Sequence, residues 1–267
     1  MLKDRIKTSP KKLRCKNCQL IYKGHYCPRC GQNAGVKKFD FSYFIKESFI
    51  SSLDIENGFF PTIRLLTLRP GEALRAYLQG KRLSLTVPMR YLLVMGTIAA
   101  WISIRYKIFA GENAGEAPIA LLNFIEKEFW EYATEFLTVL NIVTVPIFAL
   151  FSYLFFRSSG YNYSENLILN VYTTAHQLFF LLVCFPFIEL FPVLKSELLF
   201  VYFAITLLYN IWVYLSFFDQ WYLIGLLKTA GALVTAYTVQ LFVNYGIFSL
   251  LKVVNLIPHL KSIDLPG

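Results

Sequence analysis

Long apolar segments constrain the fold of this chain more than any other feature. A helix needs about 20 apolar residues to cross the hydrocarbon core of a bilayer. The chain is 56% hydrophobic, and several of its segments reach this length. We therefore predict an all-α polytopic membrane helical bundle within 88–267. It would have about five spans, in the ranges 88–109, 135–156, 167–191, 197–218 and 223–251.

Charge is distributed unevenly along the chain, whose formal net charge is +9. Residues 1–90 hold 18 of the 26 lysines and arginines but only six of the 17 acidic residues. A basic segment beside apolar spans favours an anionic membrane surface as the partner, with nucleic acid as the weaker candidate. The positive-inside rule places the amino terminus in the cytosol and, with five spans, the carboxyl terminus on the opposite side.

Four cysteines near the amino terminus form two Cys-x-x-Cys pairs, separated by the span 19–26. A two-residue spacer lets one tight turn direct both sulfurs at a single tetrahedral zinc ion. The span between the pairs is long enough for a short hairpin, so we predict a small zinc ribbon in 1–36. Gly31 suits a turn that needs a positive φ after the second pair. The predicted zinc ligands are Cys15, Cys18, Cys27 and Cys30.

A disulfide or a redox-active pair is the competing interpretation of these cysteines. The chain opens with a polar stretch and no signal peptide, which predicts a cytosolic ribbon. Thiols are kept reduced in the cytosol, and this favours a metal. Four thiolates leave no position for water, so we expect a structural site and not a catalytic one. His25 is expected to be a neighbour of the site and not a ligand.

Residues 37–87 are predicted to form amphipathic helices at the membrane interface. Apolar residues recur at helical spacing in 41–53 and again in 74–78. We expect Pro70 to begin a new helix and Gly80 to end it. The basic side chains either reach lipid phosphates or face solvent while the helices pack on the bundle. The predicted lipid- or partner-binding residues are Arg64, Arg69, Arg75, Lys81 and Arg82.

Polar side chains inside the third span are the main functional candidates of the membrane region. Several lie on one helical face, which could line a path for an ion or a small solute. The alternative is hydrogen bonding between helices, which is common in membrane bundles. Ser164 is expected to cap this helix. The candidate intramembrane site is Glu165, Asn170, Thr173, Thr174, His176 and Gln177, and other spans contribute Asn141, Asn210, Lys228, Gln240 and Asn244.

Motifs of common enzyme classes are absent from the sequence. It has no Walker loop, no Gly-x-Ser-x-Gly elbow and no His-Glu-x-x-His pair. No cluster of acidic residues is placed to hold a catalytic metal at the bilayer. We therefore expect a role that is not enzymatic.

Three stretches of the chain are distinctive in combination: CKNC…GHYCPRCGQ, FFPTIRLLTLRPGEALRAYLQGKR and YNYSENLILN. Together they resemble a bacterial membrane family classed as domain of unknown function 3667. The resemblance implies a short zinc ribbon, an Arg-Pro-Gly…Gly-Lys-Arg segment before the membrane and a later Tyr-Asn-Tyr…Glu-His-Leu stretch. In a bacterial inner membrane, the orientation predicted above places the carboxyl terminus in the periplasm. Asn166 stands where the family usually has histidine after Glu165, so a Glu-His pair is not carried over.

These features predict a membrane-bound scaffold or regulatory protein. Its zinc ribbon would contact anionic lipid headgroups or a protein partner. A small-solute or ion transporter or channel, using the polar face of the third span, is the second interpretation. A lipid-modifying enzyme is the third, since Glu165 and His176 could carry protons. The sequence predicts no particular ligand or oligomeric state.

Overall fold

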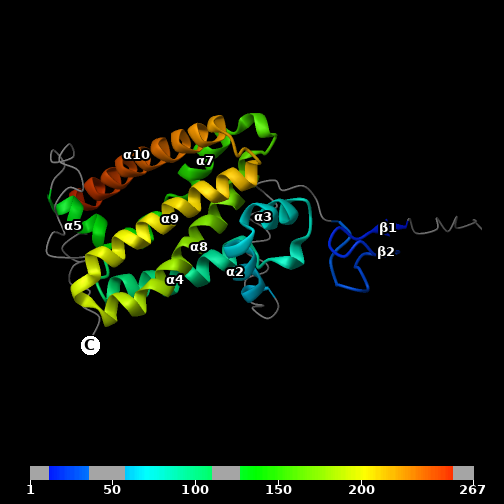
Figure 1. Ribbon diagram of the computed structural model, residues 1–267, viewed down its shortest axis with the longest axis horizontal. Helices are drawn as coiled ribbons and strands as arrows, with labels where there is room; N and C mark the ends of the chain where they lie inside the picture. The colour runs from blue at the N-terminus through cyan, green and yellow to red at the C-terminus, as the bar shows by residue number, and fades with distance from the viewer. Residues whose placement is uncertain (1–11, 36–57, 110–126, 255–267) are drawn as a thin grey trace, which may run out of the picture. The chain divides into compact units, whose positions relative to one another are not determined.

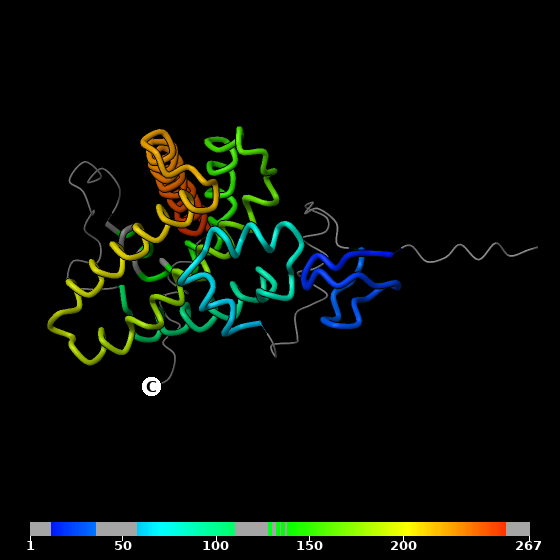
Figure 2. Tube along the Cα trace, turned by 45° about the vertical axis from the view of Figure 1, so that its right-hand side comes forward, coloured from blue at the N-terminus to red at the C-terminus, as the bar shows by residue number. Residues whose placement is uncertain are grey.

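The computed structural model describes residues 12–35, 58–109 and 127–254 (Figures 1 and 2). Its internal contacts divide the chain into two compact units, Met1–Val87 and Pro88–Gly267. The amphipathic helix expected around residues 41–53 lies outside the described residues.

The amino-terminal module closes a separate hairpin-like turn around each cysteine pair. Strand β1 (Leu13–Arg14) pairs antiparallel with β2 (Ile21–Tyr22) around the first pair. An isolated bridge between Tyr26 and Asn33 flanks the second pair. The predicted hairpin between the pairs, in 19–26, is therefore wrong. We call each cysteine pair with its turn a knuckle. The backbone hydrogen bonds of each knuckle are formed within that knuckle, so the chain reverses direction twice.

Two short helices follow in the same unit, α2 (Phe59–Leu68) and α3 (Pro70–Leu78). Helix α2 ends at its C-cap, Arg69, because Pro70 has no N–H with which to continue its hydrogen bonds. The fixed φ of Pro70 suits the first turn of α3. The predicted division at this proline is thus confirmed. Leu74, Tyr77 and Leu78 are all buried, as the apolar face of α3 requires.

Helix α3 ends in a Schellman motif, as the glycine predicts. Gly80 has φ 111°. The Lys81 N–H donates to the Ala76 carbonyl at 2.9 Å, and the Gly80 N–H donates to the Tyr77 carbonyl at 3.0 Å. A short 3-10 helix, η1 (Arg82–Ser84), follows.

A buried threonine joins α2 to the chain after η1. The Thr86 N–H donates to the Thr62 hydroxyl oxygen at 2.7 Å, and that hydroxyl donates to the Gly58 carbonyl at 2.6 Å. Thr62 is fully buried, so this pair of hydrogen bonds closes the helical part of the first unit.

The second unit is a helical bundle. Within the described residues, four of its helices are long and apolar enough to cross a membrane, by length and composition. The all-helical polytopic fold is confirmed, and the chain is an integral membrane protein. The four helices are α4 (Pro88–Arg105), α8 (Tyr163–Leu190), α9 (Lys195–Phe218) and α10 (Leu223–Val253).

The predicted span 135–156 is not one continuous helix. It contains α6 (Leu137–Val143) and α7 (Val145–Phe155), which meet at Thr144. Pro146 lies in the first turn of α7, where it cannot donate a hydrogen bond back into α6. The structure thus has, within the described ranges, four long spans and a shorter apolar helix in place of the fifth span.

Helix α8 is the centre of the bundle. It packs against α4, α7 and α9, while α10 packs against α7 (Figure 1). Of the apolar segment of α8 that is long enough to cross a membrane, 61% is buried inside the protein, compared with 28% of the corresponding segment of α10. The remaining elements are α5 (Lys127–Glu135), η3 (Arg157–Ser159) and η4 (Pro192–Leu194). Polar side chains on α8 are therefore mostly enclosed by other helices.

Candidate functional site

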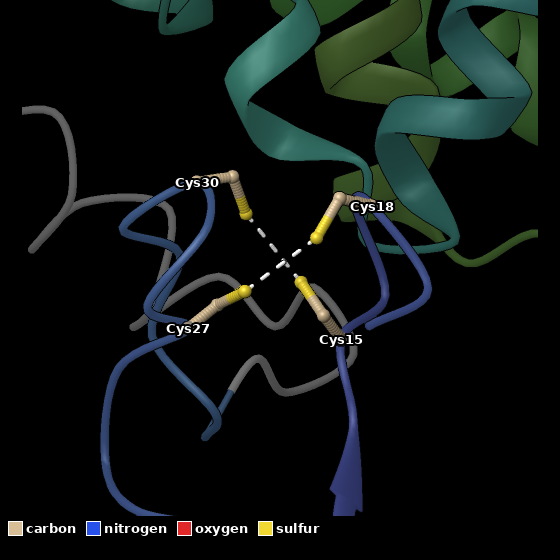
Figure 3. A group of neighbouring side chains, drawn as sticks. All are labelled: Cys15, Cys18, Cys27 and Cys30. Carbon is tan, nitrogen blue, oxygen red and sulfur yellow. Dashed lines mark hydrogen bonds between the residues drawn. The ribbon is translucent and has the colours of Figure 1, made fainter. Parts of the chain in front are cut away.

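The four cysteine sulfurs of the ribbon point into one shared space (Figure 3). All four Sγ atoms lie within 4.8 Å of one another. The Cys15 and Cys30 sulfurs are 3.6 Å apart, and the Cys18 and Cys27 sulfurs are 3.5 Å apart. A tetrahedral ion with metal–sulfur bonds of about 2.3 Å would hold its sulfurs about 3.8 Å apart. The four residues therefore fit a metal ion of this size.

The four cysteines do not form disulfides in this structure. Each of the four cysteines is a free thiol, and a disulfide would need sulfurs about 2.05 Å apart. His25, between the two pairs, is exposed and does not belong to the group that could hold the ion. The arrangement agrees with the prediction that the four cysteines alone could serve as ligands.

The two cysteine pairs are held by the same backbone hydrogen bonds. The Cys15 N–H donates to the Leu20 carbonyl, and the Cys27 N–H donates to the Gln32 carbonyl, both at 2.9 Å. The first cysteine of each pair thus bonds to the residue five positions later. This repeat makes the two knuckles equivalent halves of one site.

The equivalence extends to a left-handed residue in each knuckle. Gln19 has φ 64° and Gly31 has φ 75°, each four residues after the first cysteine of its pair. The positive φ predicted for Gly31 is confirmed. Gln19 adopts the same conformation with a side chain, which is less favourable than for glycine. Its Nε2 donates a 3.3 Å hydrogen bond to the Lys16 carbonyl.

Two of the four thiols have pKa values that are shifted in opposite directions. The backbone N–H of Leu20 lowers the pKa of Cys18, but burial and the neighbouring sulfurs outweigh it and raise this pKa to about 11. Burial raises the pKa of Cys27, yet backbone N–H groups of Cys30 and Arg29 and the Cys18 thiol outweigh it and lower this pKa. Four thiolates in so small a space repel one another, and a divalent cation would offset that repulsion.

The predicted basic residues divide by exposure. Arg64, Arg69 and Lys81 are exposed, and Arg75 is half-buried. Arg82, in contrast to the other four, is buried, with only 9% of its surface exposed. After the left-handed turn at Gly80, the side chain of Lys81 is exposed and that of Arg82 is buried.

Lys81 lines a cavity of about 250 Å³ together with ribbon residues. Arg14 and Lys16 are the other two cations of its lining, and both flank a predicted zinc ligand in the sequence. Among the residues that the structure describes, no carboxylate lines it. We call it the basic pocket, lined by Arg14, Cys15, Lys16, Gln19, Gln79 and Lys81.

A buried hydrogen bond joins the ribbon to the end of α3. Gln32 Nε2 donates to the Gly80 carbonyl oxygen at 2.8 Å, and Gln32 is 5% exposed. This bond connects the second knuckle to the Gly-Lys-Arg element. The sequence alone does not predict this hydrogen bond, because 48 positions separate its two residues.

Glu165 serves as part of a helix cap. The Asn162 side chain accepts a hydrogen bond from the Glu165 N–H, and the Asn162 N–H donates to Glu165 Oε2, both at 2.8 Å. These two bonds form the capping box of α8. The cap is therefore Asn162, and the prediction that Ser164 caps this helix is wrong.

A chain of hydrogen bonds continues from this cap through three helices. The Ser152 hydroxyl of α7 donates to Asn166 Oδ1 at 2.9 Å. Asn170 Nδ2 donates to the same hydroxyl at 3.0 Å, and the Tyr214 hydroxyl of α9 donates to Asn170 Oδ1 at 2.8 Å. These residues hold helices together, which is the interhelical role that the sequence left open.

Two other candidates, Thr173 and His176, also have partners within the protein. The Thr173 hydroxyl donates to the Leu169 carbonyl at 2.8 Å. His176 is fully buried, and its Nδ1 lies 2.9 Å from the Tyr91 hydroxyl of α4. Eleven positions separate it from Glu165 on the same helix, a rise of about 16 Å. The structure therefore does not bring the two candidate proton carriers together.

Asn170, Thr174 and Gln177 line a cavity inside the bundle. Amides from other helices, including Gln240 and Asn244 of α10, line it as well. The sequence identified each of these polar residues within its own segment. Their assembly depends on the packing of α8, α9 and α10, which local sequence patterns do not specify.

Comparison with known proteins gives one match. A family model described as "Protein of unknown function (DUF3667)" matches residues 56–100. The matched range covers α2, α3, η1 and most of α4, including the Arg-Pro-Gly…Gly-Lys-Arg segment, and over this range it supports the predicted family. Neither the curated proteins nor the solved structures gave a match.

Proposed function

We propose that this member of the DUF3667 family is a membrane-bound scaffold or regulatory protein whose zinc ribbon binds an anionic lipid headgroup. The observation that carries the proposal is the basic pocket, where Arg14 and Lys16 of the ribbon and Lys81 line one cavity. Three cations around one cavity suit a phosphate group, which accepts several charge-assisted hydrogen bonds.

Zinc would organise this pocket without taking part in chemistry. The ribbon has a very small hydrophobic core, in which Cys15, Tyr22 and Cys27 are the buried members. A module with so little core needs a metal to fold. Because Arg14 and Lys16 flank Cys15, a zinc ion bound by Cys15 would also fix both cations. Four thiolates would fill the zinc shell, so the ion would be structural.

The position of the pocket in the chain favours a lipid over a protein or a nucleic acid. Its lysine precedes the first long apolar helix, α4, by only a few residues, so the pocket is tethered close to a bilayer. A basic residue near an anionic leaflet contributes about 1 kcal/mol. The excess of bases in residues 1–90 supports the cytosolic leaflet of a bacterial inner membrane as this surface.

The test compares the full-length zinc-loaded protein in nanodiscs of phosphatidylcholine with nanodiscs that also contain phosphatidylglycerol. Hydrogen exchange of residues 13–34 and 79–82 is the measurement. We expect slower exchange in anionic discs. The double substitution Lys16→Ala and Lys81→Ala should weaken this protection by about 30-fold, since it removes two bases worth about 1 kcal/mol each.

The matched control is Lys23→Ala with Arg29→Ala, which removes the same charge from exposed ribbon positions outside the pocket. It should keep most of the protection. If the control loses as much as the pocket variant, general charge and not the pocket explains binding. If wild-type exchange is the same in both lipids, headgroup binding is wrong and an acidic protein partner becomes the better proposal.

A further inference from the structure

A second cavity, of about 250 Å³, lies inside the helical bundle and is separate from the basic pocket. Helices α5 to α10 all contribute to its wall, and among the described residues that line it none is charged. It lies near the middle of the long helices, as Thr206 of α9 and Gln240 of α10 show. We call it the amide cavity, after Asn141, Asn170, Gln177, Asn210, Gln240 and Asn244.

Part of this amide set is used within the protein. Gln240 Nε2 donates to Asn141 Oδ1 and to the Thr144 hydroxyl, both at 2.8 Å. Asn210 Nδ2 lies 3.4 Å from the Tyr237 hydroxyl. These bonds fix the orientation of the amides on one wall. The cavity is therefore built by specific contacts between helices.

Two amides in the lining have unused hydrogen-bonding capacity. Asn244 is 7% exposed, and within the described chain its Oδ1 is a buried acceptor with no hydrogen-bond donor. Gln177 is half-buried, and no side-chain hydrogen bond is found for it among the described residues. Buried polar groups in proteins are nearly always paired, so an unpaired acceptor in a cavity indicates a donor that comes from outside the chain.

Aromatic side chains form much of the remaining wall. Phe129 is fully buried, and the half-buried Phe148 packs edge-to-face on Tyr237 with ring centroids 4.9 Å apart. Phe203 of α9 is 46% exposed and Tyr237 of α10 is 43% exposed. In a membrane-spanning bundle these exposed faces meet hydrocarbon. Phe203 and Tyr237 therefore belong both to the cavity lining and to a lipid-facing surface beside α9 and α10.

We infer that the amide cavity binds the uncharged, hydroxyl-bearing headgroup of a neutral lipid that enters from the bilayer beside α9 and α10. A hydroxyl supplies the donor that Asn244 lacks, and the absence of charge from the lining disfavours phosphate or carboxylate headgroups. The volume is just below the range of about 300–1,000 Å³ for drug-sized ligands, so it suits a headgroup with its chain outside. This site is independent of zinc and of the basic pocket.

The test uses a diazirine-bearing monoacylglycerol as the probe, with the full-length protein in phosphatidylcholine nanodiscs. A fatty acid and a phosphatidylcholine with the same diazirine chain are the comparison probes. We expect the monoacylglycerol to label α9 and α10 about tenfold more than either, the difference that one buried hydrogen bond provides. Asn244→Leu should remove this preference. Thr238→Leu, an exposed α10 position outside the cavity, should keep it.

Two further variants cover the other outcomes. Gln177→Leu repeats the comparison at a half-buried position if Asn244→Leu does not fold, as judged by size-exclusion chromatography and thermal unfolding. Lys16→Ala with Lys81→Ala should label like the wild type, which separates this inference from the headgroup proposal above. Equal labelling by all three probes, or an undiminished preference in the folded leucine variants, would overturn the inference and leave a cavity filled by water or annular lipid.

Discussion

Gln32 of the ribbon donates its side-chain N–H to the carbonyl oxygen of Gly80, at 2.8 Å, in a buried contact. Gly80 is the left-handed residue that ends α3, so the bond ties the second knuckle to the closing turn of this helix. The contact gives the Gly-Lys-Arg element a structural role. Its glycine ends the helix and presents a carbonyl, while its lysine lines the basic pocket.

Removing the Gln32 donor should release the ribbon from α3 without unfolding it. Gln32→Leu leaves the Gly80 carbonyl without this partner, at a cost of about 1–3 kcal/mol. We expect faster hydrogen exchange at residues 79–82 and an unchanged zinc content. Gln32→Glu keeps the size of the side chain but loses the donor, so it should behave in the same way. Exchange equal to the wild type in both variants would show that the bond does not hold the two parts together.

Loss of one cysteine should abolish the ribbon but spare the bundle. Cys27→Ser removes a buried member of the four-sulfur group, and structural zinc sites supply about 10–16 kcal/mol of binding free energy. We expect less than half an equivalent of zinc, rapid exchange in 13–34, and an unchanged thermal transition of the helices, because the bundle is a separate compact unit. Acid should have the same effect, since zinc binds thiolates and protons compete as pH falls. Full zinc occupancy in Cys27→Ser would contradict the assignment.

The two left-handed positions of the knuckles predict substitutions of opposite sign. Gln19→Gly places the residue without a Cβ at φ 64°, and should stabilise the zinc-loaded ribbon by about 1 kcal/mol. Gly31→Ala forces a Cβ onto φ 75° and should destabilise it by about the same amount. Open space surrounds Gly31, so the backbone conformation and not a clash causes the loss. Exchange rates within 13–34 measure both effects, and equal rates in the two variants would refute the argument.

Asn170 should stabilise the bundle through its bonds to α7 and α9. Asn170→Ala removes contacts with Ser152 and Tyr214, at 3.0 and 2.8 Å. Each such bond in a membrane bundle is worth about 0.6 kcal/mol on average, so we expect a loss near 1–2 kcal/mol. Thermal unfolding in detergent measures it. Tyr214→Phe with Asn170→Ala should be less than additive, because both remove the same bond. If the two losses in free energy of unfolding were strictly additive, the bond between Tyr214 and Asn170 would not be the source of the stabilisation.

The sequence predicts the elements of this fold better than their assembly. Span lengths identified four long helices, and Pro70 and Gly80 marked the ends of α3 correctly. Pro146 indicates an interruption of the helix in 135–156, but a proline alone does not distinguish a kinked helix from two separate helices. The pairing of Gln32 with Gly80 was not predictable, because no local pattern relates two residues that lie 48 positions apart.

The same limit applies to the intramembrane site. Helical periodicity placed Asn170 and Gln177 on one face of α8 correctly, and both line the amide cavity. Asn244 belongs to a helix far along the chain, and only packing reveals that it shares this cavity. Glu165 was different. The spacing Asn-x-x-Glu is a capping-box pattern, so the sequence alone contains the signal that identifies this carboxylate as part of a cap.

The capping box gives a final prediction that separates a structural role of Glu165 from a catalytic one. Glutamine is accepted at the third position of such a box, since its side-chain oxygen can still accept the hydrogen bond from the Asn162 N–H. Glu165→Gln should therefore leave the thermal unfolding temperature close to the wild type. Asn162→Ala removes the oxygen that accepts from the Glu165 N–H, at 2.8 Å, and should cost about 1 kcal/mol. A lipid-modifying enzyme that used this carboxylate for proton transfer would show the reverse order, with turnover lost in Glu165→Gln and largely kept in Asn162→Ala. Thin-layer analysis of lipids incubated with each purified variant, alongside its unfolding curve, decides between the two roles.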